Sequence, residues 1–80
     1  MTKDEQLGFL KSMYDDSVRK RLTAEINHRA ASSMLMSGTD KHGKLVGIKN
    51  ESVQLIQAMD IQIRVIERII EEVRTETLKI

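Results

Sequence analysis

The segment that decides the fold is 52–80, SVQLIQAMDIQIRVIERIIEEVRTETLKI, in which apolar side chains recur at alternating spacings of four and three residues. This spacing is a heptad repeat, typical of a long helix that packs along its length on other helices. The repeat consists of Ser52, Ile56, Met59, Ile63, Ile66, Ile70, Val73, Thr77 and Ile80. We therefore predict a helix over about residues 50–77, capped at its start by Asn50 or Ser52.

The apolar surface of this helix is wider than the repeat alone. At about 100 degrees per residue, Leu55, Val65 and Ile69 lie on one side of the repeat and widen the apolar arc to nearly half of the circumference. One neighbouring helix cannot cover such an arc. Isoleucine at both core positions also disfavours a parallel two-stranded coiled coil. We therefore expect copies of the chain to meet through an interface formed by Ile56, Met59, Ile63, Ile66, Ile70 and Val73.

A second long helix is predicted over about residues 2–36. Thr2 and Glu5 have the spacing of a capping box at its start. Side chains that are apolar or small then recur every four residues, a stripe that turns slowly around the helix and can meet different neighbours at its two ends. The stripe is formed by Leu10, Tyr14, Val18, Leu22, Ile26 and Ala30. Thr23 leaves an alternative open, in which this helix is broken and a second one begins near Thr23.

The segment 37–49 is predicted to connect the two helices, because three of the four glycines lie within it. Gly38 can supply the left-handed residue that follows a helix end. The apolar residues 45–48 are too few to form an element of their own, so this long connection is expected to be either a mobile lid or a packed piece. The predicted fold is all-α: a helical hairpin, forming a single domain over residues 1–80, that assembles into a homo-oligomeric helical bundle.

The composition supports self-association. A lone domain of 80 residues buries only about 60 to 65% of the surface of its unfolded chain, so a further source of stability is expected. The chain has no cysteine, which excludes disulfides, thiolate metal sites and cysteine nucleophiles. No stretch approaches the roughly 18 apolar residues of a membrane span, and the charged start does not resemble a signal peptide. We expect a cytoplasmic protein that does not bind a membrane.

No catalytic motif is visible in the sequence. The only histidines, His28 and His42, lie fourteen residues apart and have no ligand-like carboxylate pattern beside them. The sequence lacks a nucleophile elbow, a phosphate-binding loop and a zinc-protease helix. We therefore expect a protein that is not an enzyme and that needs neither a metal nor another cofactor.

Basic residues suggest a different kind of site. In an oligomer, symmetry multiplies these groups, so a cleft between subunits could hold a phosphorylated or nucleotide ligand. The candidate ligand-binding residues are Tyr14, Arg19, Lys20, Arg21, His28, Arg29, Lys41, His42 and Lys44. The simpler interpretation is a solvated face, since consecutive helical residues point in different directions. Acidic residues four positions away, such as Asp16 before Lys20 and Glu25 after Arg21, can also pair with these charges.

The sequence thus favours a small homo-oligomeric interaction protein that acts by binding a protein partner. Its size and shape are common among virus-encoded accessory factors and regulators, and this comparison is an analogy of size and shape only. One alternative is an oligomeric sponge that sequesters a small phosphorylated or nucleotide ligand between subunits. Another is a nucleic-acid-binding dimer, which the net charge of +1 makes less favoured.

Overall fold

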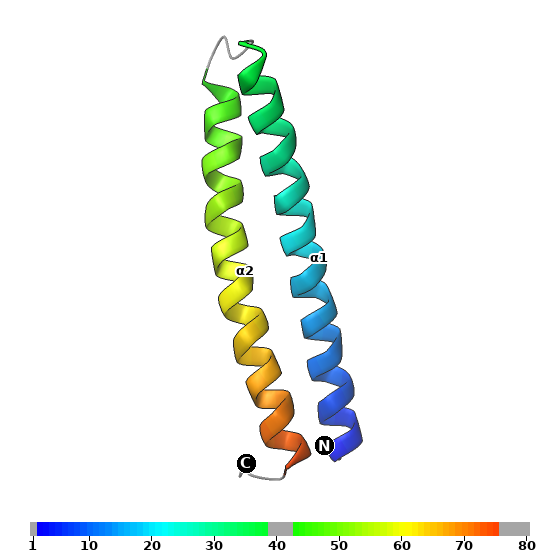
Figure 1. Cartoon of the computed structure of the whole chain (residues 1–80). Coiled ribbons are helices and arrows are strands. Elements are labelled where there is room, and N and C mark those ends of the chain that lie inside the picture. Colours follow the sequence, from blue (N-terminus) through cyan, green and yellow to red (C-terminus); the bar gives the residue numbers. More distant parts are fainter. Residues whose placement is uncertain (1, 39–42, 76–80) are drawn as a thin grey trace.

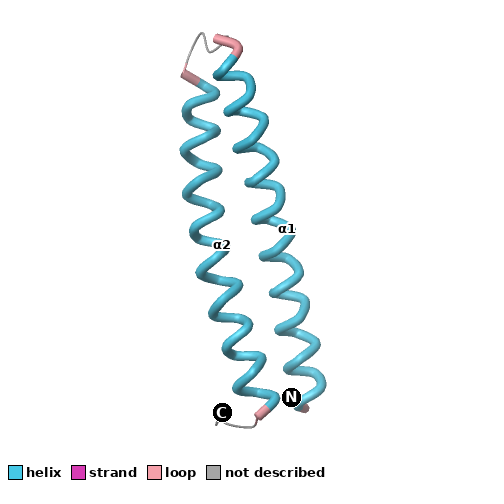
Figure 2. Tube along the Cα trace, in the orientation of Figure 1, coloured by secondary structure: helices cyan, strands magenta, loops and turns pink. Residues whose placement is uncertain are grey.

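The chain folds into a hairpin of two long antiparallel helices, α1 (Lys3–Met36) and α2 (Lys44–Arg74), in a computed structural model that describes residues 2–38 and 43–75 (Figure 1). The hairpin measures 54 × 15 × 15 Å, and the start of α1 and the end of α2 lie at the same end of the rod. The described residues contain no strand (Figure 2). The prediction of an all-α helical hairpin is confirmed.

The start of α1 is capped as the sequence predicts. The Thr2 hydroxyl accepts a hydrogen bond from the Glu5 amide at 3.2 Å and lies 3.1 Å from the Glu5 carboxylate, to which it donates. A side-chain oxygen at this position satisfies one of the amides that a helix start leaves without a backbone partner. The Lys3 ammonium also donates to the Arg74 carbonyl at 3.1 Å, which joins the start of α1 to the end of α2.

Helix α1 is continuous, so the alternative break near Thr23 does not form. The Thr23 hydroxyl donates to the Arg19 carbonyl at 3.0 Å, within the preceding helical turn. Such a bond lets threonine stay inside a helix with its hydroxyl satisfied. The helix ends at Met36, and Gly38 follows with a φ of 75°, the left-handed conformation predicted for it.

The predicted connection 37–49 is wrong in its second half, because α2 already begins at Lys44. Gly43, with a φ of 69°, provides the turn into the helix, and the Gly47 amide donates to the Gly43 carbonyl at 3.1 Å. The predicted caps Asn50 and Ser52 therefore lie inside α2. The Ser52 side chain is buried, and its hydroxyl donates to the Ile48 carbonyl at 2.7 Å.

The early start of α2 has a physical reason in the heptad repeat. Leu45 and Lys49 are both half-buried, and they continue the alternating spacing backwards from Ser52. Lysine can occupy such a position because its aliphatic stem packs on the neighbour while its ammonium reaches water. At the other end α2 stops at Arg74, and the predicted repeat positions Thr77 and Ile80 lie outside the described residues.

The two helices meet along a seam in which a buried residue recurs every seven positions. Helix α1 contributes only small residues, and α2 contributes mostly larger ones, so the larger side chains fit against a narrow helix surface. The buried residues are Ser17, Ala24 and Ala31 of α1 and Ser52, Met59, Ile66 and Val73 of α2. Among the described residues no large side chain is completely buried, so this core is thin.

The four-residue stripe of α1 leaves the seam, as its slow turn around the helix implies. Leu10 and Tyr14 at its start are half-buried, whereas Leu22 is 54% exposed and Ile26 is 59% exposed. The large apolar residues in the middle of α1 therefore lie mostly in water and outside the seam. Small residues take their places in the seam.

Candidate interaction surface

The residues predicted to join copies of the chain lie along the seam. Met59, Ile66 and Val73 are 5 to 7% exposed and pack on α1 of the same chain. Ile56, Ile63 and Ile70 are half-buried beside them. The chain thus covers much of its own repeat, and the apolar surface that stays uncovered lies beside the seam.

Two different flanks border the seam. The first, which we call the groove flank, contains the residues directly before the half-buried seam positions: Met13, Lys20 and Asn27 of α1 and Ile48, Leu55, Gln62 and Ile69 of α2. The second, the ion-pair flank, contains the residues directly after the buried positions: Val18, Glu25 and Ser32 of α1 and Val53, Asp60, Glu67 and Arg74 of α2. These positions fall on opposite sides of the seam in a helix pair with heptad packing.

The groove flank is hollowed near the chain ends. A shallow depression of about 300 Å³ lies between the helices there. Apart from Gln62, its lining is apolar and consists of Leu10, Met13, Ile61, Val65, Ile66 and Ile69. Ile61 is 62% exposed and Val65 is 51% exposed, so this is an apolar surface in contact with water.

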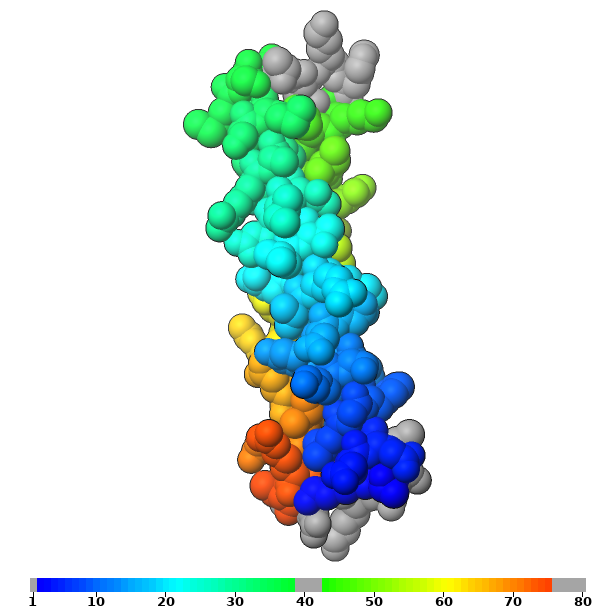
Figure 3. Space-filling model, turned by 90° about the vertical axis from the view of Figure 1, so that its right-hand side faces the viewer, coloured from blue at the N-terminus to red at the C-terminus, as the bar shows by residue number. Residues whose placement is uncertain are grey.

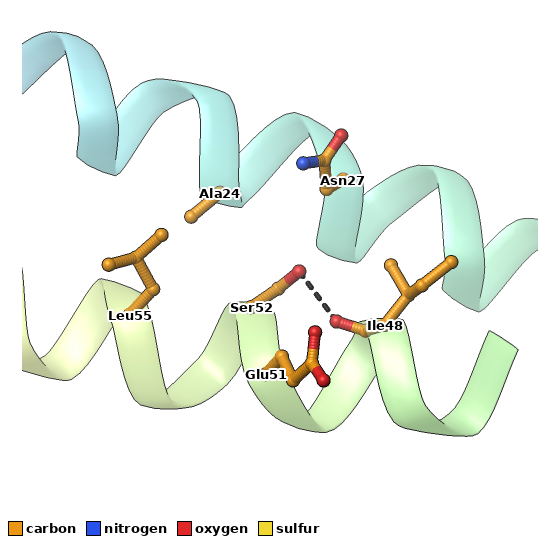
Figure 4. A pocket seen from close by; sticks show the side chains of 6 residues that line it. All are labelled: Ala24, Asn27, Ile48, Glu51, Ser52 and Leu55. Carbon is orange, nitrogen blue, oxygen red and sulfur yellow. Dashed lines mark hydrogen bonds between the residues drawn. The ribbon is translucent and has the colours of Figure 1, made fainter. Parts of the chain in front are cut away.

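A second depression, of about 320 Å³, lies on the same flank nearer the turn (Figure 4). Asn27 lies fourteen residues after Met13, and Leu55 lies seven residues before Gln62, so heptad spacing aligns the two depressions on one side. Ala24, Asn27, Ile48, Glu51, Ser52 and Leu55 line this one. In Figure 4, Leu55 and Ile48 extend from α2 toward α1. The lining is half polar, so the flank becomes less apolar toward the turn.

Charged side chains connect the helices on the ion-pair flank. The Arg21 Nε donates to Asp60 Oδ1 at 2.5 Å, and Arg21 also contacts Glu25 at 3.2 Å. Arg29 reaches the other oxygen of the Glu25 carboxylate at 2.9 Å. The hydrogen bond to Asp60 and the negative charge of Asp60 raise the pKa of Arg21 above its ordinary value. These four residues form a chain of alternating charges at the surface.

The candidate ligand-binding residues do not gather in one place within the chain. Arg21 points to the ion-pair flank, Lys20 lies on the groove flank beside Asp16 at 3.0 Å, and exposed Arg19 falls on the side away from α2. Tyr14 and His28 are half-buried along the seam, about 20 Å apart at the rise of a helix.

The remaining candidates are also separate. Arg29 is exposed and pairs with Glu25, and Lys44 is exposed at the first residue of α2. Lys41 and His42 lie outside the described residues. The predicted pairs of Asp16 with Lys20 and of Arg21 with Glu25 both form, as the solvated-face interpretation expects.

Among the described residues, no group of three or more histidine, cysteine, aspartate or glutamate side chains is arranged to hold a metal ion. Neither helix, over its described length, is apolar enough to cross a membrane.

Apolar side chains are widely exposed on the hairpin. Figure 3 shows the side of α1 that faces away from α2, where no other element covers it. Large hydrophobic residues that are 37% or more exposed occur on both helices: Phe9, Met13, Val18, Leu22, Ile26, Met34, Met36, Val46, Ile48, Val53, Leu55, Ile61 and Val65. Met13, Ile61 and Val65 adjoin one another around one depression, and contiguous apolar surface of this kind is uncommon on soluble monomers.

Comparison of the chain with protein-family models, with curated protein sequences and with solved structures finds no match.

Proposed function

We propose that this chain is a non-enzymatic interaction protein that works as a self-associated bundle of helical hairpins and binds a protein partner as an accessory or regulatory factor. The observation that supports self-association is the surface area. The accessible surface is 6277 Å² for a chain of 9.2 kDa, whereas a compact monomer of that mass has roughly 4,900 Å². The surplus, roughly 1,300 Å², is in the range that each subunit of an obligate dimer buries.

The thin core supports the same proposal. Only five hydrophobic residues of the described chain are buried: Ala24, Ala31, Met59, Ile66 and Val73. Two of these are alanines, which contribute little apolar area. A lone pair of helices with such a core is marginal in water, because conformational entropy opposes folding along the whole length. Packing against a second hairpin adds the missing burial.

Binding of a protein partner is supported by the outer side of α1. Leu22 and Ile26 are more than half exposed and lie outside the seam with α2. Phe9 is 60% exposed near the start of the helix. Contact between copies on one flank leaves part of this surface free. An amphipathic or apolar partner segment could cover it by helix packing.

The two alternative functions receive less support. A ligand held by phosphate contacts needs several basic groups that converge, and here the candidates lie on different sides of the rod and pair with acidic neighbours. Nucleic-acid binding needs a basic stripe, and the net charge is +1. We therefore place both behind the interaction protein.

The experiment that tests the proposal is thermal unfolding, followed by circular dichroism, at a series of chain concentrations. Association that accompanies folding makes the unfolding midpoint rise with concentration. We expect such a rise. A helical protein whose midpoint is the same at every concentration would contradict self-association.

A further inference from the structure

We infer that the groove flank is the surface through which two copies of this chain pack, forming a four-helix bundle with the ion-pair flanks outside. This inference rests on the proposed function, and it names the surface that self-association uses. The flank qualifies because two interhelical depressions, of about 300 and 320 Å³, open on it near Met13 and near Leu55, and the one near Met13 has an almost wholly apolar lining. The ion-pair flank holds a smaller depression of about 220 Å³, between Leu7, Lys11, Ile70 and Arg74. Apolar surface at such a contact stabilises association in proportion to its area.

The polarity of the two flanks decides between them. Packing through the ion-pair flank would remove Arg21, Glu25 and Asp60 from water, and taking charged groups out of water costs several kcal/mol per ion unless their geometry is excellent. On the groove flank and in the lining of its depressions, five apolar residues are at least 41% exposed: Met13, Ile48, Leu55, Ile61 and Val65. Their burial carries no comparable desolvation cost.

The shape of the groove flank suits close approach of another hairpin. Ala58 lies seven residues before Val65, so it falls between the two depressions on the same side of α2. A small side chain at the middle of a helix contact lets two helices come near each other, while larger side chains on either side interlock. The exposed side chains of Ile61 and Val65 in one copy are suited to pack against the hollows of the other.

The occupant we commit to is a second copy, for three reasons. The surplus of accessible surface over that of a compact monomer matches the area that each subunit of a stable dimer buries. A mainly apolar flank is self-complementary, as a two-fold symmetric interface requires. The net charge of +1 gives two copies little reason to repel each other. Polar groups of the flank, such as Lys20 with its partner Asp16, can stay hydrated at the rim.

The chain offers a matched pair of positions for the test. Leu55 on the groove flank is 41% exposed and Val53 on the ion-pair flank is 37% exposed, two residues apart in α2. We compare Leu55→Glu with Val53→Glu by sedimentation equilibrium. Leu55→Glu is expected to raise the dissociation constant of the dimer by at least about tenfold, and Val53→Glu by less than about twofold.

A second measurement keeps the test valid if Leu55→Glu fails to fold. The chain has no cysteine, so Leu55→Cys and Val53→Cys each introduce a single thiol. Thiol alkylation depends on exposure. The alkylation rate at Leu55→Cys is expected to fall by about tenfold when the chain is concentrated above its dissociation constant, while the rate at Val53→Cys stays unchanged.

Each outcome has one meaning. Suppose that the wild-type chain is a dimer, and that the two glutamate variants weaken it equally, that only Val53→Glu weakens it, or that neither does. Each of these results contradicts the assignment of the interface to the groove flank and leaves self-association intact. Protection of Val53→Cys in place of Leu55→Cys also contradicts this assignment. A wild-type chain that is monomeric, with the flank left for another kind of partner, overturns both the inference and the proposed self-association.

Discussion

Arg21 on α1 and Asp60 on α2 form an ion pair across the seam, with 2.5 Å between Nε and Oδ1. The pair connects the middles of the two helices and marks the flank of the hairpin on which charges gather. Arg21 occupies a half-buried position of the seam, where an apolar side chain would bury more hydrophobic area. The pair therefore contributes more to the alignment of the two helices than to the hydrophobic core.

The first prediction concerns this pair. Both side chains are more than one third exposed, so solvent and salt screen their attraction. In a double-mutant cycle with Arg21→Gln and Asp60→Asn, we expect a small favourable coupling in urea unfolding that disappears at high salt. A coupling that is unchanged at high salt would show that the pair is buried in the assembled protein, which contradicts its place on an outer flank.

The second prediction tests the seam. Ile66 is 5% exposed and Ile26 is 59% exposed, and both are isoleucines within long helices. Ile66→Ala is expected to lower the free energy of unfolding by about 2 to 5 kcal/mol, through lost burial and a remaining cavity. Ile26→Ala, the control, is expected to change it by less than about 0.5 kcal/mol. Equal losses at the two positions in urea unfolding would place the core elsewhere.

The third prediction uses two glycines with opposite roles. Gly43 has a φ of 69°, where an L side chain is strained, so Gly43→Ala is expected to destabilise the chain by about 1 to 2 kcal/mol. Gly47 lies inside α2, and a Cβ there meets nothing within 4 Å. Gly47→Ala is therefore expected to stabilise the chain by up to about 1 kcal/mol.

Thermal melts of the two glycine variants distinguish the structure from the sequence-based prediction of a connection that reaches residue 49. If residues 44–49 were a loop, the higher helix propensity of alanine would not stabilise the Gly47→Ala variant. A Gly47→Ala variant that melts below the wild type would contradict the early start of α2.

The fourth prediction concerns the start of α1. The Thr2 hydroxyl accepts from the Glu5 amide, and removal of such a cap typically costs about 0.5 to 2 kcal/mol. Thr2→Ala is expected to speed hydrogen exchange at the first amides of α1, whereas Thr2→Ser keeps the oxygen and retains the protection. The prediction fails if exchange at the Glu5 amide is the same in both variants.

The sequence was sufficient to predict α2 as a helix and the hairpin as its setting, because large apolar residues carry the heptad repeat there. The matching repeat of α1 was harder to detect. Its buried members are Ser17, Ala24 and Ala31, which are small, and their spacing of seven was the available signal. The larger residues around them, such as Leu22 and Ile26, form a more conspicuous apolar pattern, but this stripe leaves the seam.

The candidate surface was predicted only in part. Leu55, Val65 and Ile69 were recognised as widening the apolar arc, and all three line depressions of the groove flank. Met13 and Ile48 were not, since finding them requires the phase of α1 relative to α2 and the true start of α2. The phase depends on which side chains fit between the helices, and a single sequence carries no direct record of that fit.

Sedimentation equilibrium of the wild-type chain at micromolar concentration measures whether the hairpin self-associates. We expect a folded helical species with a mass that is a multiple of 9.2 kDa, with two copies as the smallest unit. A stable, fully helical species of 9.2 kDa that stays monomeric as the concentration rises would contradict this expectation.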